Sequence, residues 1–239
     1  MSTVNMTVVS LTSRVLLGRR RGVFLLILPA ILVLLAIGLR IYAGQSVEIA
    51  SQVLSVFAVG TVVPLLGLII GTGVIGPEID DGSIVYILSK PVSRLTIVLS
   101  KLALAIGCVI VFAGIPTLIA GLIMAGLQGG FAVGFAVGAV LAGIAYCAIF
   151  VLLAVITKHA VVIGLFYALI WESLIGNFVP GAQVLSVQRW AQSVTDLIDK
   201  VQPTGVGPAV GIPLLIVAAV AATWYAGRRL RSLTLSEAE

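Results

Sequence analysis

One segment of this chain gathers several charged residues, two prolines and a glycine between two long apolar runs. Glu78, Asp80 and Asp81 come first, and Lys90 and Arg94 follow a short distance later. Neighbouring carboxylates could bind Mg²⁺ for chemistry on a lipid phosphate. A segment acidic at one end and basic at the other could instead bind a charged protein partner or rest as a plain connector on lipid. Three acids beside anionic headgroups are unfavourable, and a connector needs only a few residues, so a protein partner is favoured.

The local pattern of this segment predicts a short helix between two longer ones. Pro77 suits a first helical position, and the three acids would then lie on the first turn, where the helix dipole favours negative charge. Apolar positions follow at helical spacing: Ile84, Ile87, Leu88 and Pro91. Pro91 is expected to end this helix, and Ser93 to cap the next one.

A second candidate is Glu172, which interrupts an apolar run. From Ala160 to Trp171 a helix would rise about 18 Å, so Glu172 is expected inside the outer leaflet or at its rim. An ionised carboxylate at the centre of a spanning helix costs about 3 kcal/mol, and less near the interface, so it needs a partner or water. Two interpretations stay open: an outer gate or substrate contact, and an interfacial anchor beside Trp171.

These residues must be positioned by helices that cross a bilayer. Hydrophobic residues make up 60% of the chain and charged residues 10%, and the mean hydropathy is +1.23. A spanning helix needs about 20 mostly apolar residues. We therefore predict an all-α polytopic membrane protein with one domain over residues 1–239 and six transmembrane helices, at about 22–42, 49–75, 102–126, 131–157, 160–179 and 208–227.

The positions of Lys and Arg predict the orientation, because positive residues stay on the cytoplasmic side. With six spans and an inside N-terminus, eleven of the fourteen basic residues lie inside, and only Arg40, Arg189 and Lys200 lie outside. An odd number of spans would place a basic cluster on the wrong face. Both termini are thus expected in the cytoplasm, in a cytoplasmic (inner) membrane. The net charge of +5 follows from this topology, so nucleic-acid binding is not indicated.

Two further helices are expected outside the spans. Val4, Val8, Leu11 and Val15 form an apolar stripe near basic residues, which suits an N-terminal helix in the inner interface. Between spans five and six, apolar residues recur at helical spacing from Val184 to Val201, with Gln188, Arg189 and Gln192 among the remaining positions. That pattern predicts an amphipathic helix on the extracytoplasmic surface, covering the membrane boundary or the top of the bundle.

Small residues and prolines predict features inside the spans. Gly134 and Gly138 permit close helix approach. Pro64 and Pro116 suggest kinks or hinges in spans two and three. Cys108 and Cys147 also lie in spans and are expected to be small buried side chains.

The sequence contains no GxxxxGK[ST] phosphate loop and no polar segment large enough for a nucleotide-hydrolysing domain. If ATP is used, another chain must bind it. We expect no catalytic residue, cofactor or metal in this chain.

The loop also resembles a known family. The pattern E-x-x-x-G-[ST]-I, L-S-K-P-V-S-R and a later K is present from Glu78 to Lys101. It is similar to the first cytoplasmic loop of type-2 ABC transporter permeases. The six spans, the inside termini and the helical insertion between spans five and six extend the resemblance over the chain. Trp171-Glu172, Val179-Pro180-Gly181 and Leu185-Ser186 are also similar to a run in that family.

The resemblance implies a coupling helix seated in a cleft of a separate ATPase, which binds ATP and Mg²⁺. Two permease copies, identical or different, would associate with two ATPases. The coupling residues carried over are Glu78, Asp80, Asp81, Gly82, Ser83, Pro91, Ser93 and Arg94. Ion pairs of Glu78 and Arg94 with the ATPase are a hypothesis. Because the spans show no charged pocket, the substrate is expected to be a lipid, a peptide or an amphiphilic drug.

Two rival functions remain. An intramembrane enzyme would use the acids from Glu78 to Asp81, but the next inner loop offers only Lys158 and His159 to help them. A secondary transporter or channel usually places acids at mid-membrane, where only Glu172 comes near. Metal-dependent lipid turnover would favour the enzyme, and gradient-driven flux without an ATPase would favour the transporter.

Overall fold

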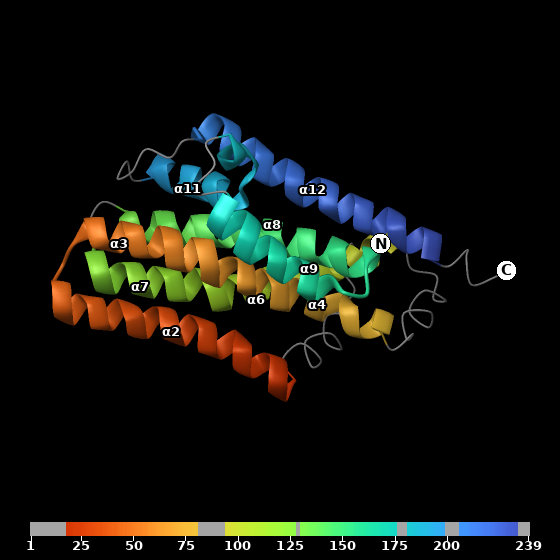
Figure 1. Ribbon diagram of the computed structural model, residues 1–239, viewed down its shortest axis with the longest axis horizontal. Coiled ribbons are helices and arrows are strands. Elements are labelled where there is room, and N and C mark those ends of the chain that lie inside the picture. The colour runs from red at the N-terminus through yellow and green to blue at the C-terminus, as the bar shows by residue number, and fades with distance from the viewer. Residues whose placement is uncertain (1–17, 81–93, 128–129, 176–180, 199–205, 234–239) are drawn as a thin grey trace.

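The computed structural model describes residues 18–80, 94–127, 130–175, 181–198 and 206–233. In these ranges all regular secondary structure is helical, which confirms the all-α prediction for this part of the chain. The long helices lie side by side along one axis (Figure 1). The helices predicted within 1–17 and 81–93 lie outside the described residues.

Five helical runs are long and apolar enough to cross a membrane: Gly22–Ala43, Val47–Glu78, Thr96–Ala125, Phe131–Ile156 and Pro208–Leu230. The first run is α2 (Arg19–Ala43). The second joins α3 (Val47–Val53), η1 (Leu54–Val62) and α4 (Val63–Asp80), and the third joins α6 (Arg94–Val109), η2 (Ile110–Gly114) and α7 (Ile115–Ala125). The last two are α8 (Phe131–Ile156) and α12 (Pro208–Leu233). Five of the six predicted spans thus have matching helices, and the protein is a multi-pass membrane protein. The third begins earlier than predicted, because Lys101 lies inside the helix.

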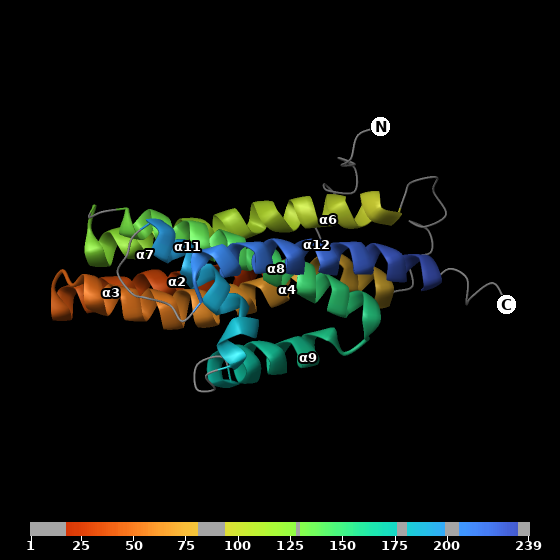
Figure 2. The ribbon, with the colours of Figure 1, turned by 90° about the horizontal axis from the view of Figure 1, so that it is seen from above.

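The structure describes residues 160–175 of the predicted span at 160–179. These residues form α9 (Ala160–Phe166) and the π-helix η3 (Tyr167–Ile175), with an apolar part from Ala160 to Glu172. In Figure 2 this segment stands to one side of the layer formed by the other helices. The six-span topology therefore stays a prediction.

The bundle has two ends, which we name by their expected sides of the membrane. The outer end holds the turn Gly44–Ser46 and the end of α7 at Gly126 and Leu127, where the Gln45 amide donates to the Ala125 carbonyl (2.7 Å). The inner end holds the end of α4 and the turn Thr157–His159 between α8 and α9.

The α8 helix is the centre of the bundle and contacts α4, α6, α7, α9, α11 and α12. Its approach to α4 is close because α4 presents glycines. A methyl group at Gly67 would lie 2.7 Å from Tyr146 Cβ, and one at Gly71 would lie 2.8 Å from Phe150 Cβ. Small residues thus allow two membrane helices to pack backbone against side chain.

The two prolines expected to kink spans two and three each follow a π-helical stretch. Pro64 is the second residue of α4, directly after η1, and Pro116 is the second residue of α7, directly after η2. A wide π turn accommodates a proline that has no N–H and whose ring would clash in a regular α turn. Both spans are therefore irregular at the predicted places.

The helix predicted between spans five and six is present as α11 (Val187–Ile198), preceded by the short η4 (Ala182–Leu185). The prediction left two positions open, the membrane boundary and the top of the bundle, and the helix packs on the bundle with its polar side buried rather than solvated. It lies against α8 and α12, and nearly all residues from Val187 to Thr195 are buried, including the polar Gln188 and Gln192. The close helix approach expected at Gly134 and Gly138 is found here, between α8 and α11. A Cβ atom at either glycine would touch Thr195, and one at Gly138 would also touch Ala191.

Candidate functional site

At the inner end, a buried ion pair joins α4 to α6. Lys101 Nζ lies 2.7 Å from Glu78 Oε2, with the lysine 1% exposed and the Glu78 side chain 21% exposed. The same ammonium group donates a hydrogen bond to the Val74 carbonyl. A buried lysine must be paired and hydrogen-bonded to stay charged, and these two contacts supply that.

The end of α4 differs from the expected pattern. Pro77 was predicted to begin a separate helix, but it lies inside α4, which continues to Asp80. A proline within a helix cannot donate to the carbonyl four residues earlier and tends to expose nearby carbonyls. The Val74 carbonyl, three residues before Pro77, accepts a hydrogen bond from Lys101, which also pairs with Glu78 just after the proline. Contacts with α6 therefore lie on both sides of the proline.

Glu172 lies at the centre of a buried polar cluster and is 0% exposed. Its carboxylate accepts hydrogen bonds from the Tyr167 hydroxyl (3.1 Å), the Ser186 hydroxyl (2.6 Å) and the backbone N–H groups of Val187 (3.0 Å) and Gln188 (3.4 Å). The last two groups belong to the first turn of α11, where the helix dipole favours an anion. Glu172 thus binds the N-terminus of α11 to η3.

Tyr146 adds a further polar group to this cluster. Its side chain is fully buried in α8 and interacts electrostatically with Glu172. Its hydroxyl forms no hydrogen bond of normal geometry within the described residues. Glu172 is therefore surrounded by hydroxyl and N–H donors, which suits an ionised carboxylate with acceptor oxygens only.

The two dipeptides Trp171-Glu172 and Leu185-Ser186 are in direct contact. The Trp171 indole donates to the Leu185 carbonyl (3.5 Å), beside the bond between Glu172 and Ser186. The structure thereby gives a physical reason for both dipeptides, because together they fix the path between η3 and α11.

Two glutamines connect α11 to span two. Gln188 Nε2 donates to the Ser55 carbonyl (2.9 Å), and Gln192 Nε2 approaches the same oxygen at 3.4 Å. Ser55 lies in η1, and the amide fits because Gly60 has no side chain: a Cβ there would lie 2.6 Å from Gln188 Nε2. The polar side of α11 is therefore buried against an irregular turn of another span rather than solvated.

The family model described as ABC-2 family transporter protein matches residues 10–206. The chain belongs to this family. The match covers most of the sequence, including the loop, η3 and α11. A comparison with curated proteins found no match.

Membership in the ABC-2 family makes this chain a transporter membrane component and implies association with an ABC ATPase. Of the residues predicted to couple to that ATPase, Glu78 is described with its side chain. Asp80 is the last residue of α4 and Arg94 the first of α6, so they bracket the loop. Asp81, Gly82, Ser83, Pro91 and Ser93 lie outside the described residues.

Sequence reasoning missed the partners of both acids. Lys101 was predicted as an inside basic residue at the end of the loop motif, and Tyr146, Tyr167 and Ser186 were not predicted as partners of Glu172. One signal was available for Lys101, because it directly precedes a long uncharged tract from Leu102 to Thr157. No local signal identified the tyrosines, because aromatic residues are common in apolar helices.

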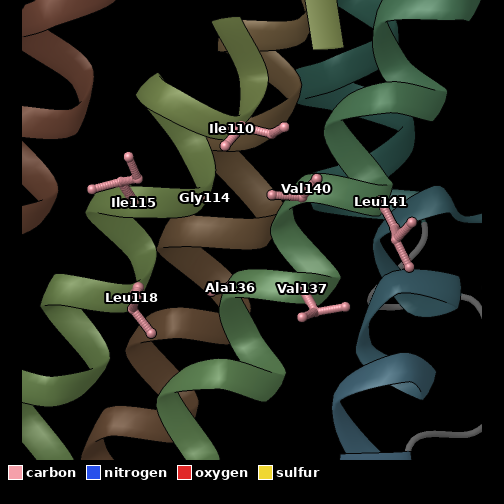
Figure 3. Close-up of a pocket in the computed structure, with 8 residues that line it drawn as sticks. All are labelled: Ile110, Gly114, Ile115, Leu118, Ala136, Val137, Val140 and Leu141. Atoms are coloured by element: carbon pink, nitrogen blue, oxygen red, sulfur yellow. The ribbon is translucent and has the colours of Figure 1, made fainter. Parts of the chain in front are cut away.

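An apolar pocket of about 250 Å³ lies between η2–α7 and α8 (Figure 3). It is lined by aliphatic residues and a glycine: Ile110, Gly114, Ile115, Leu118, Ala136, Val137, Val140 and Leu141. No polar side chain lines it, so its chemistry suits hydrocarbon.

Proposed function

We propose that this chain is the permease subunit of an ABC transporter and is driven by a separate ATPase that engages residues 78–94. The family match carries the proposal. The loop from Asp80 to Arg94 joins two helical runs that each extend toward the outer end. A displacement of the loop would therefore be carried along both spans toward the translocation path.

The expected assembly contains two permeases and two ATPases, with ATP and Mg²⁺ bound in the ATPase chains. The sequence supports this division of labour, because it contains no phosphate loop of its own. The positive-inside pattern supports a cytoplasmic membrane location with the loop and both termini inside.

The proposed substrate is a lipid, a peptide or an amphiphilic drug. Lys101 and Glu172 are the charged residues buried among the described residues, and each is engaged by other groups of the chain. In the part of the chain that the structure describes, the helices thus offer no buried charge for a polar ionic solute.

The proposed outer gate is α11, with Glu172 as the group that holds it closed. The support is the position of Glu172 at one end of α11. Glu172 binds one end of a helix whose glutamines also contact span two. Releasing these bonds would free α11 from α8 and η1 and open the outer half of the bundle.

Affinity purification of the tagged chain tests the proposal. We expect a phosphate-loop ATPase to co-purify, and its ATP hydrolysis to depend on the permease. Reversing the loop charges with Asp80→Lys and Asp81→Lys should reduce the amount retained. Glu48→Lys, at the exposed start of α3 near the outer end, is the matched control and should have no effect. Gradient-driven flux by the chain without any ATPase would refute the proposal.

A further inference from the structure

We propose that Lys101 is a positioning residue that clamps the two ends of the 81–93 loop together, so that α4 and α6 move as one body. The inference rests on the proposed function. It assigns Glu78 to an intramolecular contact rather than to the ATPase.

The geometry of the pair is the first argument. Lys101 is 1% exposed, and its ammonium group contacts two groups of α4, the Glu78 carboxylate and the Val74 carbonyl. Glu78 Oε2 is itself buried. A carboxylate oxygen turned inward onto a buried cation is poorly placed to bind a separate protein. The pair is instead placed to hold one helix against the other.

The second argument is the weakness of α4 at the same place. Pro77 lies in the last turns of α4, and its ring removes one hydrogen bond from the helix. Without support, α4 could bend there when the loop is pushed. Lys101 binds on both sides of the proline, at Val74 and at Glu78, and so bridges the weak turn.

The third argument is the position of the clamp relative to the loop. Lys101 lies seven residues after Arg94, which is about 10 Å along α6. Val74 lies six residues before Asp80, which is about 9 Å along α4. Any displacement of the loop reaches this level before it reaches the rest of either span. A clamp here would convert a push on one flank into a joint motion of both.

A charge-exchange series separates the clamp from a direct ATPase contact. The variants are Glu78→Lys, Lys101→Glu, the double exchange, and Lys101→Met with Lys101→Arg as its conservative partner. Each is made in a chain lacking Cys108 and Cys147 and labelled with spin probes at Gly76→Cys and Ala103→Cys. Position 76 has open space for a side chain, and Ala103 is exposed on α6.

The readouts are the amount of ATPase retained and the distance distribution between the two probes, without nucleotide and with ATP plus vanadate. With the Glu78–Lys101 pair intact we expect one narrow distribution that nucleotide leaves unchanged. Lys101→Met should broaden it and make it nucleotide-dependent, while Lys101→Arg and the double exchange should restore the narrow form. ATPase retention should match that of the wild-type chain throughout, because none of these variants removes a group that binds the ATPase.

Two results would overturn the clamp. One is a narrow, unchanged distribution in Lys101→Met. The other is a loss of ATPase retention in Glu78→Lys that the double exchange does not restore. That result would mean that Glu78 binds the ATPase directly. If the wild-type chain retains no ATPase, the proposed function fails, and the distance distributions of the chain alone still decide whether Lys101 holds the helices together.

Discussion

The Glu172 carboxylate accepts a 3.0 Å hydrogen bond from the backbone N–H of Val187, at the first residue of α11. This bond places a charged side chain of η3 at the positive end of a buried helix. The helix dipole and the surrounding donors offset the cost of removing the charge from water. The position and stability of α11 should therefore depend on the Glu172 carboxylate.

Glu172→Gln is expected to destabilise the protein. The amide keeps one acceptor oxygen but turns an NH₂ group toward N–H and O–H donors, so at least one hydrogen bond to a charged group is lost. The free energy of unfolding should fall by about 2–3 kcal/mol. Denaturant unfolding in detergent measures it, and Glu48→Gln, an exposed acid, should change it by less than about 0.5 kcal/mol. Unchanged stability together with altered transport would instead favour a direct substrate contact at Glu172.

Gly60→Ala should displace Gln188. The added methyl group would lie 2.6 Å from Gln188 Nε2 and 2.9 Å from its amide carbon, which is closer than packing allows. The expected cost is about 1–3 kcal/mol in thermal or chemical unfolding. Gly38→Ala is the matched control, because a Cβ there meets nothing within 4 Å.

Removing the Gln188 side chain should recover part of the stability lost in Gly60→Ala. In the double variant Gly60→Ala/Gln188→Ala the clash is absent, so the cost should be smaller than the sum of the two single costs. Additive costs would mean that Gln188 is not seated at Gly60.

Gly138→Ala should separate α11 from α8. The new Cβ would lie 2.9 Å from Thr195 Oγ1 and 3.0 Å from the Ala191 carbonyl oxygen. The second contact is with backbone and cannot be relieved by a rotamer change, so we expect a loss of about 1–3 kcal/mol and faster proteolysis within residues 181–198. Gly107→Ala, which meets nothing within 4 Å, controls for the change in helix propensity. Equal behaviour of the two variants would contradict the close contact.

Cysteine labelling tests the orientation. Leu127 is 94% exposed at the outer end, and His159 is exposed at the inner end. In a chain lacking Cys108 and Cys147, a membrane-impermeant maleimide should label Leu127→Cys in intact cells. It should label His159→Cys only after permeabilisation. The reverse pattern would invert the topology and place the 78–94 loop outside the cell.

The sequence by itself determined where five of the apolar helices run, because length and hydropathy are properties of each segment alone. It also determined the irregular turns near Pro64 and Pro116 and the close helix approach at Gly134 and Gly138. A proline lacks a backbone N–H and a glycine lacks a side chain wherever it stands, so these effects can be predicted from the residue itself. The family resemblance drawn from the loop motif was confirmed by the match over residues 10–206.

Only the tertiary structure decided the partners of the polar groups. Glu78 and Lys101 meet because α4 and α6 pack together, and Gln188 reaches the Ser55 carbonyl from 133 residues away. The polar face of α11 was therefore predicted to be solvated, although the structure buries it. Helical periodicity shows that polar residues share a face, but it cannot show whether water or another helix satisfies them, because hydrogen bonds across the bundle depend on how distant segments pack.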